Sequence, residues 1–159
     1  MASKTKIDFV KKNWPLAKTA FLKYGINPVA ILAKQVKESG WQPHKGAQLR
    51  KNYFGLTATK YSKPTPHWQG KSSKSNASGL LYRVYTTVQD NFLDYAWVIK
   101  TKYPEAAAAG SDIKAFVEAL AKKYTGSKNA AEIEAYKLEL RGFALQIESI
   151  AKSLGYLTV

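Results

Sequence analysis

The sequence predicts a mainly α-helical (α+β) fold with a small β-hairpin as a minor lobe. Apolar residues recur at helical spacing along most of the 159 residues, as they do in amphipathic helices. Only residues 80–85 alternate apolar and polar side chains like a half-buried strand. No internal repeat or linker interrupts the chain, and its length suits one domain with a sizeable core. We therefore expect a single domain over residues 7–156, preceded by a disordered tail over residues 1–6.

The first predicted helix covers residues 7–24. Its apolar and aromatic positions follow one face at steps of three and four residues, namely Val10, Trp14, Ala17, Phe21 and Tyr24. Pro15 lies inside this helix and removes one backbone hydrogen bond, so we expect a break or kink near Asn13. Gly25 follows the last apolar position and ends the helix.

The second predicted helix, residues 28–39, has clear signals at both ends. Asn27 is a favoured N-cap, and Pro28 suits the first helical position because an N–H there would have no helical partner. Gly40 supplies a left-handed stop. The buried face is defined by four positions at helical spacing, Val29, Leu32, Ala33 and Val36.

The remaining predicted elements alternate with loops. Residues 42–46 are predicted to be a loop, and residues 60–79, rich in Ser, Lys, Pro and Gly, a loop or mobile flap. The strand at 80–85 is expected to form half of a hairpin. Further helices are predicted to begin near Thr87, Pro104, Ser111 and Asn129, and the last of them is long.

The composition narrows the possible partners without choosing one. The formal net charge of +14 favours a polyanion, such as nucleic acid, an anionic membrane or the bacterial cell wall. The lysines are spread along the chain, and no nucleic-acid-binding motif is present. No apolar run approaches the ~20 residues of a membrane span, and we see no signal peptide.

Metal and thiol chemistry find no support in the sequence. The chain has no cysteine, which excludes disulfides and thiolate catalysis. Its two histidines, His44 and His67, have no second ligand at metal spacing, so both are expected to be exposed polar residues. We expect no cofactor and no metal.

Glu38 stands out because its charge is misplaced for a helix end. It lies in the last turn of the second helix, where the helix dipole disfavours a carboxylate, roughly 170° around from the buried face. Gln35 and Ile31 lie on its side and are expected to form the wall of a cleft. Partial desolvation there would favour the protonated carboxyl that general acid catalysis requires. The alternative is a surface Glu paired with Lys34 one turn earlier, a common arrangement on helices.

Two short motifs surround the end of this helix. Residues 33–41 read Ala-Lys-Gln-Val-Lys-Glu-Ser-Gly-Trp, and residues 52–56 read Asn-Tyr-Phe-Gly-Leu. The pair resembles the peptidoglycan glucosaminidases of glycoside hydrolase family 73, in which Ala-Gln-x-x-x-Glu-Ser-Gly-Trp carries the catalytic acid and Asn-x-Phe-Gly follows on the cleft floor. Lys34 stands where the family has Gln. The resemblance extends over roughly residues 7–156 and implies a lysozyme-like helical domain with a cleft beside the hairpin lobe.

The resemblance also implies a reaction. The enzyme would cut the N-acetylglucosaminyl-β-1,4-N-acetylmuramyl bond of peptidoglycan, with Glu38 protonating the leaving oxygen and Tyr124 as a second catalytic residue beside the sugar. A core aromatic is the alternative interpretation of Tyr124. The implied partner is a peptidoglycan glycan strand, not nucleic acid. The protein is expected to be a monomer that acts in the cell wall or periplasm after secretion or delivery.

Seven further residues are expected to bind substrate: Gln35, Trp41, Asn52, Phe54, Gly55, Trp68 and Tyr95. Gly55 would permit close approach of the backbone to the sugar. Trp68 is interpreted as an exposed stacking surface or, equally, as a ring packed back on the body. Phe54 belongs either to the cleft floor or to an aromatic cluster under a loop.

The chain departs from the family at one point. Many members carry a second carboxylate in the hairpin lobe, but residues 39–87 contain no Asp or Glu. Three explanations stay open: Asp90 or Asp94 reaches the cleft, the 2-acetamido group of the substrate is the nucleophile, or the enzyme is slow or inactive. We favour the second, with Tyr124 positioning the acetamido group. The rival functions are a muramidase or lytic transglycosylase on the same fold, or a non-catalytic basic module that binds cell wall or nucleic acid.

Overall fold

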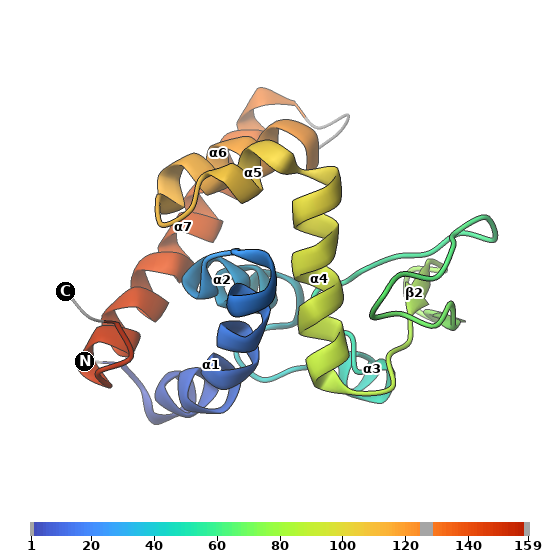
Figure 1. The fold of residues 1–159 in the computed structure, drawn as a ribbon, viewed down its shortest axis with the longest axis horizontal. Coiled ribbons are helices and arrows are strands. Elements are labelled where there is room, and N and C mark those ends of the chain that lie inside the picture. The colour runs from blue at the N-terminus through green and yellow to red at the C-terminus, as the bar shows by residue number, and fades with distance from the viewer. Residues whose placement is uncertain (1, 125–128, 158–159) are drawn as a thin grey trace.

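In the computed structural model, α2 (Pro28–Ser39) lies at the centre of a body of helices (Figure 1). The structure describes residues 2–124 and 129–157, with the backbone only at residues 123 and 124. The helices that pack against α2 are α1 (Lys4–Tyr24), α6 (Ile113–Tyr124) and α7 (Ala130–Ser153). Two more complete the body, α4 (Val88–Lys102) against α1 and the short α5 (Pro104–Ala108) between α4 and α6.

A smaller lobe lies beside the helical body (Figure 1). It contains the antiparallel hairpin of β1 (Ser72–Lys74) and β2 (Leu81–Arg83), and α3 (Lys45–Arg50) leads into it. We call residues 51–85, which follow α3, the hairpin lobe. The prediction of a mainly helical domain with a small hairpin is confirmed, and β1 is the partner that the strand at 80–85 lacked in the sequence reading.

Helix α1 begins earlier than predicted and is not broken by Pro15. The Ser3 hydroxyl accepts the backbone N–H of Lys6 at 3.3 Å, an N-cap that starts the helix at Lys4. The expected disordered tail over residues 1–6 is therefore wrong for residues 4–6. Pro15 lies within one continuous helix. The buried residues on both sides of it, Phe9 and Ala17 among them, pack into the core and offset the lost hydrogen bond.

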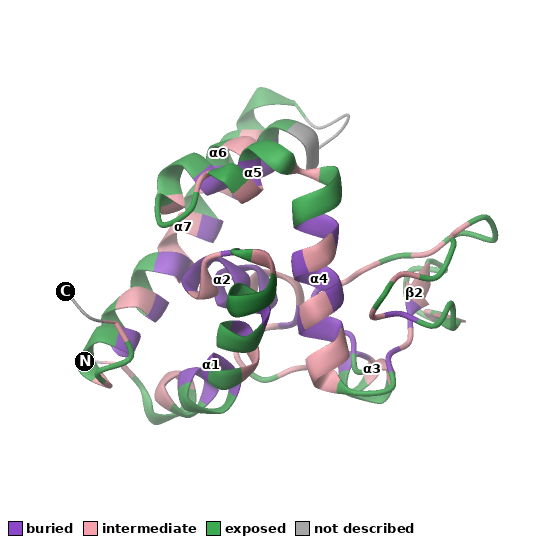
Figure 2. Ribbon diagram, in the orientation of Figure 1, coloured by how far each residue is buried: buried purple, intermediate pink, exposed green. Residues whose placement is uncertain are grey.

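The predicted N-cap of α2 is confirmed, and its burial goes further than one face. The Asn27 side chain accepts the Val29 N–H at 2.8 Å. Gly40 ends the helix, but its φ of 80° and ψ of 174° lie outside the left-handed helical conformation that was expected. Nearly the whole helix is buried, because α1, α6 and α7 surround it (Figure 2). Lys34 and Gln35 are fully buried with the apolar residues, so the predicted apolar stripe is too narrow.

The other helix ends follow the capping rules with two differences from the sequence reading. The Thr87 hydroxyl accepts the Asp90 N–H as predicted, and Asn129 caps α7. For α6 the cap is Asp112, whose carboxylate accepts the Ala115 N–H at 3.0 Å, rather than Ser111. The expected loop at 42–46 runs into α3, a helix that the sequence reading missed. None of the helices in the described residues is long and apolar enough to cross a membrane.

Candidate active site

Glu38 lines a small pocket of about 240 Å³ between the end of α2 and the hairpin lobe. Its side chain is 26% exposed. Ser39 ends α2, and the other lining residues come from the α3 segment, the turn after it and the hairpin: His44, Arg50, Asn52, Gly55, Ser75, Ala77, Ser78 and Tyr82. A carboxyl among serines, an amide and aromatic or cationic side chains is a surface that can hydrogen-bond a sugar.

Glu38 is also paired with Lys34, the partner that the alternative interpretation gave it. The Lys34 ammonium lies 2.5 Å from Glu38 Oε1 and is fully buried. It also donates to the Tyr136 hydroxyl of α7 at 3.3 Å. The pair is therefore not the exposed helix pair of the alternative reading, because one partner lies in the core and the other faces the pocket.

Gly55 faces the second oxygen of the Glu38 carboxylate. Its φ is +64°, in the left-handed region, and a Cβ built there would lie 2.9 Å from Glu38 Oε2. Both the backbone conformation and the carboxylate therefore favour glycine at this position. The predicted approach of Gly55 to a sugar stays a prediction, and in the structure the group beside Gly55 is the Glu38 carboxylate.

Two polar side chains hold the turn that carries Gly55. Asn52 donates to the backbone carbonyls of Leu56 and Arg83, both at 2.9 Å, and accepts the Leu56 N–H. Ser39 donates to the Tyr53 carbonyl at 2.9 Å. The turn is thus fixed both to the end of α2 and to β2. This gives Asn52 and Ser39 a physical role in the two sequence motifs.

We expect Gly55→Ala to lower activity by about tenfold or more, because its Cβ would displace the Glu38 carboxylate. The left-handed φ should add a stability cost of about 1–2 kcal/mol. Gly110→Ala is the matched control: its φ is +59° and nothing lies within 4 Å of its added Cβ. Both variants should lose similar stability, measured by denaturant unfolding, while only Gly55→Ala loses turnover. Equal turnover in the two variants would contradict this role of Gly55.

Phe54 and Tyr95 lie one layer beneath the pocket. Their rings stack at 4.4 Å between centroids, and Phe92 meets Phe54 edge-on at 5.0 Å. All three are buried, so the aromatic-cluster interpretation of Phe54 describes the structure. Direct contact of Phe54 or Tyr95 with the substrate stays a prediction. In the structure both rings pack against other aromatic rings under the turn that carries Gly55.

The expectation of an exposed Trp68 is wrong. The ring is 2% exposed, its indole N–H donates to the Lys71 carbonyl at 2.8 Å, and the Arg83 guanidinium lies 4.5 Å from its centroid. The side chain is packed onto the hairpin lobe, the alternative weighed for it. An indole with its polar atom satisfied and a cation over its face gains more by burial than by exposure.

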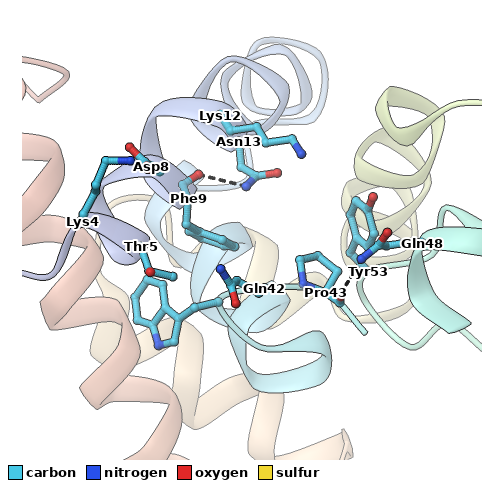
Figure 3. Close-up of a pocket in the computed structure, with 11 residues that line it drawn as sticks. Lys4, Thr5, Asp8, Phe9, Lys12, Asn13, Gln42, Pro43, Gln48 and Tyr53 are labelled. Atoms are coloured by element: carbon cyan, nitrogen blue, oxygen red, sulfur yellow. Dashed lines mark hydrogen bonds and ion pairs between the residues drawn. The ribbon is translucent and has the colours of Figure 1, made fainter. Parts of the chain in front are cut away.

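Trp41 lines a different and larger hollow of about 740 Å³ between α1 and the segment after α2 (Figure 3). In this view the Phe9 ring and the side chains of Gln42 and Tyr53 surround the space. Glu38 is not among its lining residues, so the larger of the two hollows is not the one that contains the candidate acid. Gln35 lies in the core instead, where its amide donates to Asn13 at 3.3 Å.

Neither candidate second carboxylate lines the Glu38 pocket. Asp94 is fully buried and accepts hydrogen bonds from Arg83 Nη1 at 2.9 Å, from Thr65 Oγ1 at 2.5 Å and from the Tyr85 hydroxyl. Burial, and then the charge of Asp94, raise the pKa of Tyr85, which keeps its hydroxyl a donor. Asp90 lines another depression beside residues 64–69. Among the described residues that line the pocket, Glu38 is the one carboxylate.

Comparison with known families agrees with this geometry. The sequence pattern of the glucosaminidases (mannosyl-glycoprotein endo-beta-N-acetylglucosaminidase) matches residues 14–151, which include both motifs and the whole pocket. The chain belongs to the glucosaminidase family. It is therefore a glycoside hydrolase. No curated protein matches the whole sequence significantly.

Solved structures confirm the fold of this glucosaminidase. The glycoside hydrolase domain of Salmonella typhimurium FlgJ is 20% identical with a TM-score of 0.68, over 96% of this chain and 94% of that one. The catalytic domain of the Listeria monocytogenes autolysin Auto is 15% identical with a TM-score of 0.66, over 93% and 87%. The peptidoglycan hydrolase of Sphingomonas sp. A1 is 19% identical with a TM-score of 0.62, over 92% and 94%. The lysozyme-like architecture expected from the sequence is confirmed.

The sequence reading missed several residues of the glucosaminidase pocket. Arg50 stacks on Tyr82 with its guanidinium 5.0 Å from the ring centroid and donates to Ser73 at 2.9 Å. His44 caps α3 by accepting the Ala47 N–H at 3.2 Å and also lines the pocket. For Tyr82 the sequence did offer a signal, because it lies on the polar-facing side of the predicted strand. The side chain of Tyr124, the last residue of α6, lies outside the described part of the structure.

Proposed function

We propose that this glucosaminidase is a peptidoglycan hydrolase that cleaves the N-acetylglucosaminyl-β-1,4-N-acetylmuramyl bond, with Glu38 as its general acid. The observation that carries the proposal is the partly exposed Glu38 carboxylate on the wall of a pocket, with Gly55 beside it. The substrate is supported by the names of the solved structures that share the fold, an autolysin and a peptidoglycan hydrolase. The net charge of +14 also suits an anionic wall polymer.

The proposed reaction uses the substrate's own acetamido group. Glu38 gives its proton to the glycosidic oxygen while the bond from that oxygen to the sugar C1 breaks. The acetamido oxygen then forms a bond to C1, which replaces a protein nucleophile. Water opens this intermediate and returns a proton to Glu38, so the net change is hydrolysis. We propose that Tyr124 positions the acetamido group.

Two observations favour this route over a protein nucleophile. In the described residues, Asp94 is already bonded to three donors inside the core, and Asp90 lines a different depression. Neither can take the place of a second pocket carboxylate without moving. We further propose that the chain acts as a monomer in the cell wall or periplasm, where its peptidoglycan substrate lies.

Mass spectrometry of purified peptidoglycan digested by the protein tests the function. We expect fragments with N-acetylglucosamine at the reducing end, because the proposed bond joins that sugar to the next muramic acid. Reducing-end muramic acid would identify a muramidase, and anhydro ends a lytic transglycosylase. An absence of new ends, in a folded preparation, would leave a wall-binding module and overturn the proposal.

A further inference from the structure

A buried lysine beside a candidate catalytic acid needs a physical explanation. Lys34 is fully buried, and its ammonium contacts Glu38 Oε1 at 2.5 Å and the Tyr136 hydroxyl at 3.3 Å. The ammonium also lies 5.4 Å from the centroid of the Tyr136 ring, within cation–π range. Burying a charge is costly unless it is paired and hydrogen-bonded, and α2 and α7 together supply those partners.

The pair divides the Glu38 carboxylate into two differently placed oxygens. Oε1 is held by Lys34, while Oε2 lies against Gly55, 2.9 Å from where a Cβ would be. The ion pair with Lys34 limits the rotation of the carboxylate, and the absent Cβ of Gly55 leaves room for its second oxygen. Proton transfer in a glycosidase depends on such fixed geometry, because the donor oxygen must meet the glycosidic oxygen within hydrogen-bond reach.

We propose that Lys34 is a charged positioning residue for Glu38: it fixes the carboxyl and stabilises the carboxylate that forms when the proton leaves. This inference rests on the proposed role of Glu38 as general acid. As the O–H bond of Glu38 breaks and the proton moves to the leaving oxygen, negative charge develops 2.5 Å from the Lys34 ammonium. A fixed cation at that position lowers the energy of the transition state.

The test measures kcat and KM on peptidoglycan fragments for Lys34→Gln and Lys34→Arg. For Lys34→Gln we expect kcat to fall by about tenfold and KM to stay within about twofold, because the cation acts on the transition state rather than on substrate binding. Lys34→Arg keeps the charge, so it should recover part of the lost kcat.

Lys37→Gln is the matched control. Lys37 lies on the same helix, 5.7 Å from the same Tyr136 ring, but its ammonium pairs with Glu139 at 3.2 Å. Its kcat and KM should equal those of the unchanged protein. A kcat of Lys34→Gln that equals that of Lys37→Gln would overturn the proposal.

Two further comparisons distinguish a failure of this inference from misfolding of a variant and from a failure of the proposed function. If Lys34→Gln does not fold, Lys34→Arg and Tyr136→Phe carry the test, and an unchanged kcat in both overturns it. If Glu38→Gln remains active, the proposed function itself is wrong. If Glu38→Gln is inactive while the Lys34 variants behave like the unchanged protein, the positioning role alone fails.

Discussion

Glu38→Gln should lose wall-lytic activity by roughly 100-fold or more, because an amide of the same shape cannot donate the proton. The variant should also lose stability. Its amide leaves the fully buried Lys34 without a carboxylate at 2.5 Å. We expect a cost on the order of 2 kcal/mol, below that of a wholly buried pair because Glu38 is partly exposed and Gln can still accept a hydrogen bond.

The double variant Lys34→Gln/Glu38→Gln separates the two effects. The double variant also removes the ammonium that has lost its carboxylate, so the unfolding free energy should recover toward that of the unchanged protein while lysis stays absent. Turbidity loss of purified walls gives the activity, and denaturant unfolding gives the stability. Clearing of walls at close to the original rate by Glu38→Gln would show that Glu38 is not the acid.

Local chemistry made the ends of most helices predictable. Asn27, Thr87 and Asn129 cap the helices that were predicted to begin after them, because each cap depends on residues within a few positions of itself. The missed helix α3 is only six residues long and is capped by a histidine, a residue that is not among the preferred caps. The wrong cap of α6 was an error of one residue, from Ser111 to Asp112.

Burial was harder to predict, because it depends on which elements meet in space. Periodicity gave α2 one apolar face, but three helices surround it and bury Lys34 and Gln35 as well. Trp68 lies in a polar stretch and was expected at the surface, yet Arg83, fifteen residues on, covers its ring. No local pattern contains such long-range pairings.

The candidate site was predictable where charge and backbone were unusual. Glu38 was marked by a carboxylate at the wrong end of a helix, and Gly55 by the motif that surrounds it. Arg50 and His44 carried no such signal, because they lie at the two ends of α3, a helix that was not predicted. The Lys34–Glu38 contact was anticipated from its spacing of one turn, but its depth was not.

Asp94→Asn should be among the most destabilising single changes, although it is conservative in shape. The carboxylate is fully buried and holds three parts of the chain together: Arg83 of β2, Tyr85 after it and Thr65 of the long loop. An amide removes the charge that compensates the buried Arg83 guanidinium and turns an NH₂ group toward donors. Breaking a buried ion pair from one side costs about 3–5 kcal/mol, which corresponds to a loss of roughly 6–20 °C in melting temperature.

The same variant decides whether Asp94 takes part in chemistry. If it only holds the hairpin lobe against α4, Asp94→Asn should keep most of its turnover well below its lowered melting temperature and lose it steeply near that temperature. Asp90→Asn, one turn earlier on α4, is the matched control and should change melting temperature little, because the Thr87 cap bonds its backbone N–H rather than its carboxylate. Turnover and melting are measured on the same preparations. A folded Asp94→Asn protein as inactive at low temperature as Glu38→Gln would name Asp94 as the second carboxylate. It would also require the hairpin lobe to open during turnover, since a carboxylate bonded to three buried donors has no oxygen to offer a sugar while those contacts last.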